Sequence, residues 1–291
     1  MGSRRKVESY WYLFLIPVFV ILAVVEFYPL LYSFYLSLGG SGGLTFGNYV
    51  RMVTDKDFWS SIITSLAFSI LSTIVAVGVG LGLAFLVKQE FRSRSWFEGM
   101  FILPLAMAPI AVGIEWGPAA FWDDFQSITH FGLGLPFFNE LSILFYFPVM
   151  AASEAWEWAP LIMLVALSII NNTPKEIYEA ARLHGASSWQ VFSKIMVPAV
   201  FNSPVMQFVL VLRFIDAMNS FAVPLDWSTW VGFSTSVGSP VDTLSLFLYK
   251  LLTIPSFNFP IGLVSAIAFS LLVITLVSAT LLTRALGRIS R

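Results

Sequence analysis

Two apolar segments of this 291-residue chain carry ionisable side chains at helical spacing. In the first segment, Glu154, Glu157 and Trp158 fall at positions i, i+3 and i+4, which places them on one face of a helix. The second segment carries, close to one stripe, Arg213, Asp216 and Asn219, with Phe214 beside them. Ionisable groups within a bilayer are costly, so they usually face a bundle interior or a water-filled cavity. Both sets are therefore candidates for lining a path for a polar solute.

Each set also has a purely structural interpretation. Arg213 and Asp216 can pair with each other to offset the cost of burial. Glu154, Glu157 and Trp158 can instead lie near the outer interface, where Trp is enriched and carboxylates remain hydrated. The sequence leaves these alternatives open.

Other chemistries find little support in the sequence. The chain has no Cys, and its two His residues, His130 and His184, are far apart, so neither thiol chemistry nor a His-rich metal site is expected. No G-x-x-x-x-G-K-[ST] motif for nucleotide binding is present. Gly78, Gly80 and Gly82 lie in a continuous apolar run and are interpreted as close-packing positions of a helix. An enzyme would have only the carboxylates described above for acid/base chemistry, and we expect no catalytic site.

The composition indicates a membrane protein. Hydrophobic residues make up 57% of the chain and charged residues 11%, and the mean hydropathy is +0.81. Soluble domains, by contrast, have about 25% charged residues. A net charge of −1 without a clustered basic face also argues against nucleic acid as a partner.

Six apolar stretches are long enough to cross about 30 Å of hydrocarbon as helices. They cover residues 12–38, 60–87, 97–120, 143–170, 200–224 and 259–283. The third is interrupted by Pro104 and Pro109, so a kink or break is expected there. The first is longer than the apolar run of about 7–15 residues in a signal peptide, so it is interpreted as a retained helix. The expected fold class is an all-α polytopic membrane protein, with residues 1–11 preceding a transmembrane domain at 12–291.

Basic residues set the expected orientation, because Lys and Arg accumulate in short cytoplasmic loops. One side would carry Arg4, Arg5, Lys6, Lys88, Arg92, Arg94, Lys175, Arg182, Lys194, Arg284, Arg288 and Arg291. The other side would carry Arg51, Lys56 and Lys250. Both termini and the loop at 171–198 are therefore predicted to be cytoplasmic, in a multi-pass protein of the cell membrane.

This cytoplasmic loop is predicted to form a helical hairpin. Pro174 suits the first turn of a helix, with Asn172 or Thr173 as its N-cap. Gly185 can supply a left-handed turn at its end, and a second helix begins near Ser187.

The first helix of the hairpin has one compact, partly apolar face. Its members recur at i, i+3, i+4 and i+7 and are Ile177, Ala180, Ala181 and His184. The two Ala residues would let a partner approach closely. On helix chemistry alone, the hairpin could equally be a surface feature without a partner.

The loop resembles the EAA loop of permease subunits in ATP-binding-cassette importers, whose pattern reads E-A-A-x3-G-x9-I-x-L-P. The chain departs from this pattern at Val197, where the family usually has Leu, and at His184, where sugar-type members usually have Asp. In that family the loop docks a separate ATPase. The resemblance therefore implies ATPase-coupling roles for Tyr178, Glu179, Ala180, Ala181, His184, Gly185, Ile195 and Pro198.

Other stretches resemble the maltose-transporter-like sugar permeases, in particular the MalF-like type of subunit. They are Tyr28-Pro29-Leu30-Leu31-Tyr32-Ser33, Phe46-Gly47-Asn48-Tyr49, Arg213-Phe214-Ile215-Asp216 and Thr243-Leu244-Ser245-Leu246. The resemblance implies the type I importer permease fold, in which the helices flanking the EAA loop line the translocation cavity. It would place Glu154, Glu157, Trp158, Phe214, Asp216 and Asn219 along the substrate path.

The same resemblance implies the partners. These are a second permease subunit, two ATPase subunits that bind ATP and Mg, and an extracytoplasmic sugar-binding protein, with no cofactor in this chain itself. The implied function is import of a mono- or oligosaccharide by alternating access. Two alternatives remain at this stage: the same architecture importing a polyamine, phosphate or an amino acid, and an ion-driven secondary transporter. An ion-driven secondary transporter would be expected to show internal repeats, which are not evident in this sequence.

Overall fold

The computed structural model describes residues 15–89, 92, 94–117, 143–233, 235–254 and 259–289. Within these residues the regular secondary structure is helical, without strands, which confirms the expected all-α class. The chain divides into two compact units, Met1–Asp55 with Leu251–Val273, and Lys56–Lys250 with Ile274–Arg291. The predicted cytoplasmic N-terminus at residues 1–11, His130, and residues 118–120 of the third predicted span lie outside the described residues.

The first unit joins an N-terminal helical segment to the start of the C-terminal helix. Its elements are η1 (Ala23–Phe27) and α2 (Tyr28–Ser37) within the helical segment Leu15–Ser37, η2 (Gly40–Gly42), α3 (Gly47–Thr54) and the first residues of α16 (Ile261–Ile289). The Ser37 hydroxyl lies 2.8 Å from the Tyr49 hydroxyl, and the Ser37 carbonyl accepts from Asn48 Nδ2 at 2.9 Å. Phe34 packs on Phe269 with ring centroids 4.8 Å apart. These contacts fix the turn between α2 and α3.

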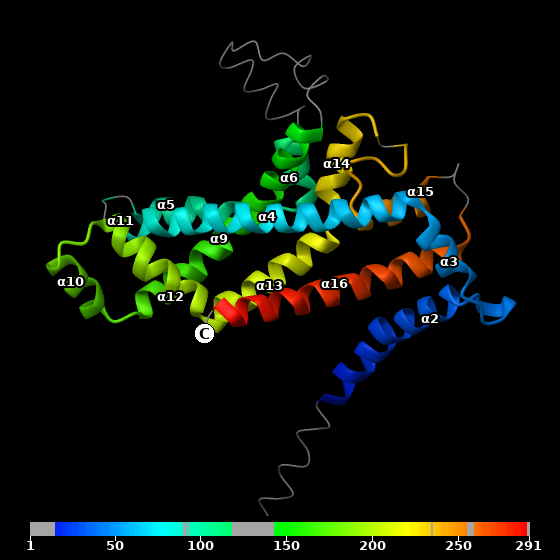
Figure 1. Ribbon diagram of the computed structural model, residues 1–291, viewed down its shortest axis with the longest axis horizontal. Helices are drawn as coiled ribbons and strands as arrows, with labels where there is room; N and C mark the ends of the chain where they lie inside the picture. The colour runs from blue at the N-terminus through cyan, green and yellow to red at the C-terminus, as the bar shows by residue number, and fades with distance from the viewer. Residues whose placement is uncertain are drawn as a thin grey trace, which may run out of the picture. The chain divides into compact units, whose positions relative to one another are not determined.

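The second unit contains the helices that carry the candidate site. They are α4 (Lys56–Lys88), α5 (Arg94–Ile102), η3 (Leu103–Ala106), α6 (Pro109–Trp116), α9 (Ile143–Asn172), α10 (Lys175–Leu183), α11 (Ser188–Val191), η5 (Phe192–Met196), α12 (Val197–Asn202), α13 (Pro204–Asn219), α14 (Ala222–Trp230) and most of α15 (Leu244–Thr253). Helices α4 and α9 pack along each other, α13 packs on both, and α14 packs on α6 (Figure 1). The hairpin of α10 and α11 lies at one end of α4 and α9.

Small residues allow α4 and α9 to approach each other closely. The buried positions of α4 recur every three or four residues and include Ser61, Ser65, Ser69, Ser72, Ala76, Gly80 and Ala84. A methyl group added at Gly80 would lie 2.8 Å from the Ala159 carbonyl oxygen and from the Ile162 side chain. Gly78 and Gly82, in contrast, face open space. The close-packing interpretation is therefore confirmed for Gly80 and wrong for its two neighbours.

The third predicted span is broken. The helical segments Ser95–Ala106 and Pro109–Trp116 meet at an angle of 105°. Ala108 is extended, with ψ of 139°, because the residue before a proline is disfavoured in the helical region. The interruption expected at Pro104 and Pro109 is present as a sharp bend.

The segment predicted as a span at 200–224 is also divided. Segments Ser188–Asn202 and Pro204–Asn219 meet at 74°, and Ser203, which precedes the proline, is extended with ψ of 127°. The helix that follows ends at Asn219, and the separate helix α14 begins at Ala222 after two non-helical residues. The prediction of one continuous helix from 200 to 224 is therefore wrong, because the chain bends before Pro204 and the helix ends at Asn219.

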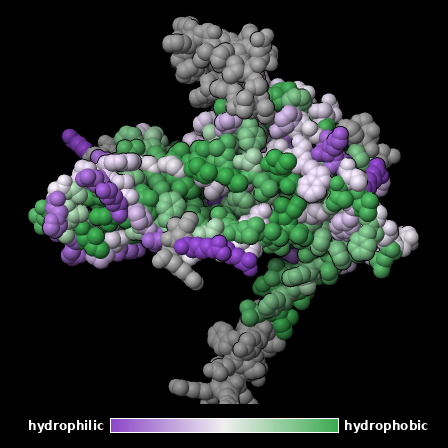
Figure 2. Space-filling model, viewed as in Figure 1, coloured by the Kyte–Doolittle hydropathy of each residue, from purple (hydrophilic) through white to green (hydrophobic). Residues whose placement is uncertain are grey.

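Among the described residues, four helices are long and apolar enough to cross a membrane by themselves. These are Leu15–Ser37, Lys56–Lys88, Tyr146–Asn172 and Ile261–Arg288. If each of the two bent pairs forms one span, the number rises to six. On the face shown in Figure 2, hydrophobic residues cover much of α4, and hydrophilic residues gather over the hairpin of α10 and α11.

Candidate functional site

A buried arginine ties three helices of the second unit together. Nη1 of Arg213, on α13, donates to Glu154 Oε1 of α9 at 3.5 Å and to Asp216 Oδ2 at 3.1 Å. Its Nη2 donates to the Ser72 hydroxyl of α4, and its Cζ lies 5.3 Å from the centroid of the Trp158 ring. A fully buried charge is tolerated when it is paired and hydrogen-bonded. We call these five residues the central cluster, and the pairing of Arg213 with Asp216 that the sequence left open is confirmed.

The second oxygen of Glu154 connects the central cluster to the chain beyond α13. The Ser220 hydroxyl donates to Glu154 Oε2 at 3.1 Å, and the Ser220 carbonyl accepts from Thr243 Oγ1 at 3.1 Å. The Leu244 backbone N–H donates to the Ser65 hydroxyl of α4 at 2.7 Å. Because Glu154 is only 3% exposed, the alternative of a hydrated carboxylate at the outer interface is wrong for this residue.

Sequence analysis did not identify the hydroxyl groups that complete this network. Ser72, Ser220 and Thr243 lie on three different segments, and nothing in their spacing relates them to Glu154 or Arg213. The one available signal was the recurrence of Ser along α4, which alone indicates small packing residues. Tertiary packing brings these hydroxyl groups close to Arg213 and Glu154.

One side of α9 and α13 is open. The partly or fully exposed positions of α13 include Val205, Phe208, Leu212, Asp216 and Asn219, and those of α9 include Glu157, Leu161, Leu164, Ser168 and Asn172. Both sets recur every three or four residues, so each forms a stripe along its helix. The stripes meet near the hairpin, where a hollow of about 330 Å³ is lined by residues that include Val165, Ser168, Asn172, Ser203 and Val205. We call this surface the open face.

Most of the predicted path residues lie on or beside the open face. The Asp216 side chain is 47% exposed, and Asn219 is exposed while its amide donates to the Ile215 carbonyl at 2.7 Å. Glu157 and Trp158 are partly exposed. Phe214 and Glu154 depart from the prediction, because both side chains are buried.

A second buried ion pair lies in the segment that follows α14. Lys250 Nζ donates to Asp242 Oδ1 at 2.7 Å and to the Phe233 carbonyl at 2.8 Å. Asp242 also accepts from the Ser239 hydroxyl at 2.6 Å and from the Ser239 backbone N–H at 3.0 Å. Both charged side chains are at most 1% exposed. We call this the sealed pair, and sequence analysis, which treated Lys250 only as an outer loop charge, did not predict it.

The hairpin of α10 and α11 is shaped by backbone hydrogen bonds at its turn. Gly185 has φ of +81°, in the left-handed region, as its position after the first helix predicts. The Ala186 N–H donates to the Ala181 carbonyl at 3.0 Å and the Gly185 N–H to the Arg182 carbonyl at 2.9 Å, the pair of bonds that defines a Schellman motif.

The helix starts in the hairpin differ from the prediction. Pro174 itself is the N-cap of α10, without a side-chain cap, and the Thr173 hydroxyl donates to the Ile169 carbonyl instead. The second helix has a capping box that sequence analysis missed. Ser187 Oγ accepts from the Gln190 N–H at 3.2 Å, and Gln190 Oε1 accepts from the Ser187 N–H at 2.8 Å.

The predicted coupling residues divide between two sides of the hairpin. Tyr178 is buried and its hydroxyl donates to the Ile170 carbonyl of α9 at 3.1 Å, so it holds the hairpin on the bundle. Ala181 and Ile195 are partly buried and pack against the same core. The exposed members are Glu179, Ala180, His184, Gly185 and Pro198.

The outward side of α10 is apolar. Ile177 is 45% exposed and Leu183, which was not among the predicted coupling residues, is 88% exposed. With Ala180 and His184 they recur at helical spacing on one exposed stripe. Glu179 borders a different surface, a hollow of about 610 Å³ between the hairpin and the end of α4.

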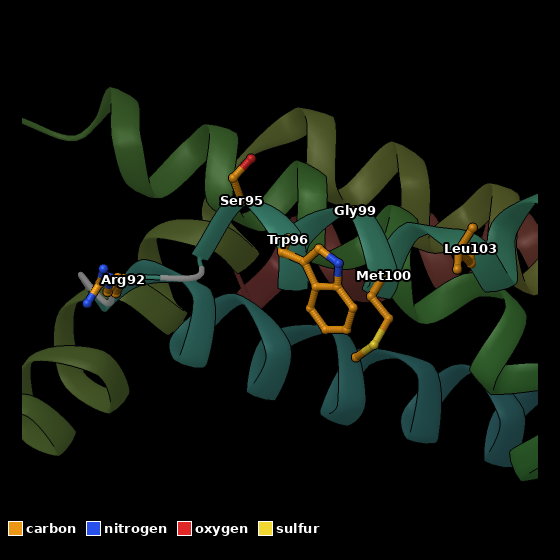
Figure 3. Close-up of a pocket in the computed structure, with 6 residues that line it drawn as sticks. All are labelled: Arg92, Ser95, Trp96, Gly99, Met100 and Leu103. Atoms are coloured by element: carbon orange, nitrogen blue, oxygen red, sulfur yellow. The ribbon is translucent and has the colours of Figure 1, made fainter.

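A larger hollow follows one side of α5. Its volume is about 910 Å³, and its lining consists of Arg92, Ser95, Trp96, Gly99, Met100 and Leu103 (Figure 3). None of these residues belongs to the central cluster or the open face. This hollow is therefore separate from the charged groups on α9 and α13.

Comparison with known proteins identifies a sequence family. A profile of the family described as "Binding-protein-dependent transport system inner membrane component" matches residues 76–291. This match spans the hairpin, the sealed pair and every residue of the central cluster except Ser72.

Several curated proteins are similar over most of their length. The chain is 27% identical over 258 residues to the "Probable starch degradation products transport system permease protein AmyD" of Thermoanaerobacterium thermosulfurigenes, with 84% of each chain covered. It is 25% identical over 302 residues to the "Trehalose/maltose transport system permease protein MalF" of Thermococcus litoralis, covering 96% of this chain and 94% of that protein. It is 25% identical over 282 residues to the "Lactose transport system permease protein LacF" of Rhizobium radiobacter, covering 88% and 90%.

Solved structures share the fold. A chain from the crystal structure of a bacterial ABC transporter involved in the import of the acidic polysaccharide alginate superposes with a TM-score of 0.78 at 18% identity, covering 100% of both chains. A chain of the bacterial alginate ABC transporter in complex with a periplasmic protein bound to an alginate pentasaccharide gives a TM-score of 0.74 at 18% identity, covering 100% of this chain and 98% of that one.

Proposed function

Because the chain belongs to the family of binding-protein-dependent transport system inner membrane components, we propose that it is the permease subunit of a sugar importer driven by ATP. The observation that carries the proposal is the open face. It places carboxylate, amide and indole groups on the two helices that flank the cytoplasmic hairpin. Starch degradation products, trehalose, maltose and lactose stand in the names of the relatives described above.

The chemistry of the open face suits a saccharide. The Asp216 and Glu157 carboxylates can accept hydrogen bonds from sugar hydroxyl groups, and Asn219 adds an amide beside them. The partly exposed Trp158 ring can cover the apolar C–H surface of a pyranose. Behind them, the buried pair of Arg213 and Glu154 holds α13 against α9.

Coupling to ATP hydrolysis is proposed to act through the hairpin. The apolar stripe of Ile177, Ala180 and Leu183, ending at His184, is the surface we assign to the separate ATPase. Tyr178 on the opposite side would transmit its movement to α9 through the Ile170 carbonyl. ATP and Mg bind the ATPase subunits, whose closure draws the hairpins together and opens the path outward, and hydrolysis returns it to the inward-facing state.

The assembly that follows from this proposal has several subunits. The chain would pair with a second permease subunit, two ATPase subunits and an extracytoplasmic sugar-binding protein in the inner membrane. Both termini and the hairpin would face the cytoplasm, as the distribution of Lys and Arg predicts.

The direct experiment is ATPase activity of the complex purified with its associated subunits and reconstituted in liposomes. The binding protein is added empty or loaded with each sugar of a panel. We expect at least one sugar to stimulate ATP hydrolysis and to enter the liposomes. A complex without an ATPase, or one stimulated only by a non-sugar solute, would overturn the proposal.

A matched pair of glycine variants tests the role of the hairpin. Gly185 and Gly232 have φ of +81° and +79°, and neither has an atom near the position of an added Cβ. Valine at either position therefore introduces similar local strain, of about 1–2 kcal/mol. We expect Gly185→Val to uncouple ATP hydrolysis from uptake by at least tenfold and Gly232→Val to leave coupling within about twofold. Equal coupling in the two variants would contradict the docking role.

A further inference from the structure

Two basic side chains of the second unit are buried, and both are already paired with carboxylates. They are Arg213 and Lys250, the basic residues that are buried in the described parts of this unit. Arg213 is fully buried between Glu154 and Asp216, and Lys250 is sealed against Asp242. Neither cation is available to a solute on the open face.

Acidic groups, in contrast, remain available. Three carboxyl groups, those of Glu154, Glu157 and Asp216, stand near one guanidinium, so acidic groups outnumber the basic group in this region. Asp216 is nearly half exposed and Glu157 partly exposed, whereas Arg213 is enclosed. The charge presented to a solute is therefore negative.

The remaining polar groups of the open face do not reverse this charge. Asn219 lies one turn from Asp216, and Ser168 and Asn172 line the end of the face near the hairpin. These groups are neutral donors and acceptors suited to hydroxyl groups. A sugar carboxylate would meet like charge without a compensating cation, and in a site of low dielectric such repulsion is stronger than in water.

The shared fold does not decide which charge of saccharide the open face accepts. The solved structure with TM-score 0.78 comes from a transporter whose described cargo is an acidic polysaccharide, yet its sequence identity to this chain is 18%. The side chains of the open face, rather than the backbone, must determine which charge is accepted.

We propose that the open face selects neutral or basic saccharides and rejects acidic ones, with Asp216 and Glu157 as the residues that impose this selection. The proposal rests on the sugar transport proposed above and names the charge class of the substrate.

The test measures sugar binding to the permease–ATPase complex in nanodiscs, without the binding protein, by saturation-transfer difference NMR. The probes are a neutral trisaccharide, a uronic-acid trisaccharide and an amino-sugar trisaccharide of the same size. We expect the neutral and amino sugars to bind at least tenfold more tightly than the uronate. In the Glu157→Gln/Asp216→Asn variant, the uronate should bind within about threefold of the neutral sugar.

Controls separate a change of selectivity from a loss of structure. Glu176→Gln removes an exposed carboxylate on α10 that is not part of the open face, and it should keep the tenfold preference. The single variant Glu157→Gln leaves the buried pairs intact and should reduce the preference by at least twofold even if the double variant is poorly folded.

The outcomes distinguish the two proposals. Equal binding of uronate and neutral sugar by the unmodified complex, or an unchanged preference in the carboxylate variants, would overturn the charge selection and leave sugar transport standing. Binding of none of the three sugars would overturn both.

Discussion

The central cluster and the sealed pair place buried cations in very different surroundings. Lys250 has one carboxylate partner, and that carboxylate is itself enclosed. Arg213 has two carboxylate partners, of which Glu154 is buried and Asp216 is nearly half exposed. The sealed pair can therefore only stabilise the fold, whereas the central cluster both stabilises it and presents charge to the open face.

This difference shows how a charged network can serve stability and transport at once. In the central cluster, the guanidinium is bonded to both a buried and an exposed carboxylate, so the exposed Asp216 can meet a solute while Glu154 keeps Arg213 paired. In the sealed pair, every described oxygen of Asp242 is occupied by Lys250 or Ser239. Substitutions should separate the two roles.

The largest effect is expected from Arg213→Met. It leaves the 3% exposed Glu154 without its cation and removes the contacts to Ser72 and Asp216. Breaking a buried pair in this way costs about 3–5 kcal/mol. We expect a large fall in the thermal unfolding temperature of the purified complex and loss of uptake. Stability close to that of the unmodified protein would show that the cluster is not a structural tie.

Lys250→Met should destabilise the complex somewhat less, by about 3 kcal/mol, because a single buried carboxylate is left unpaired. Uptake per folded complex should remain within about twofold, since both side chains of the sealed pair are buried and neither belongs to the open face. Thermal unfolding and uptake normalised to folded protein check both statements. A tenfold loss of normalised uptake would remove the distinction between the two sites.

Double variants sharpen the comparison. Replacing both members of a buried pair with neutral residues often restores stability. Lys250→Met/Asp242→Asn should recover most of the stability and retain uptake, because Asn still offers an acceptor to Ser239. Arg213→Met/Glu154→Gln should recover stability but not uptake. Recovery of uptake in the second variant would mean that charge in the central cluster is purely structural.

Asp216→Asn should change stability by less than about 1 kcal/mol, as for other ion pairs with an exposed member. Its effect should appear in transport, as a change of at least threefold in the KM for a neutral sugar. An unchanged KM together with a lowered unfolding temperature would assign Asp216 to the fold instead of the path.

The smallest effect on stability is expected at Asp226, a carboxylate without a cationic partner in the described structure. Asp226 of α14 has an oxygen that is buried without a hydrogen-bond partner in the described structure, and burial raises its pKa from 3.8 to about 6. Between these values the folded state holds a proton that the unfolded state has released, so stability falls as the pH rises towards 6 and the penalty persists above it.

Asp226→Asn therefore tests the contrast between paired and unpaired carboxylates. The variant should unfold at a slightly higher temperature than the unmodified protein at pH 7, and this advantage should shrink at pH 5. Thermal unfolding at the two pH values provides the measurement. A lower unfolding temperature at pH 7 would indicate a hydrogen-bonding role for the carboxylate.

The hairpin was largely predictable because its structure is local. Gly185 needs only its own left-handed backbone conformation, and the Schellman bonds join residues within six positions of one another. The capping box of Ser187 and Gln190 was equally local and could have been found from the S-x-x-Q spacing. The sequence did not show that Tyr178 packs onto the bundle, because its partner, Ile170, belongs to the preceding helix.

The sequence by itself determined the membrane class, the helical hairpin and the shared faces of Glu154 with Trp158 and of Arg213 with Asp216, since all depend on composition or on spacing within one segment. Tertiary structure alone decided which charges became enclosed. Ser72 and Ser220 reach Arg213 and Glu154 from other segments, and Asp242 meets Lys250 through a turn of the chain. Spacing along one helix fixes which side chains share a face, but whether that face is buried depends on the helices packed against it.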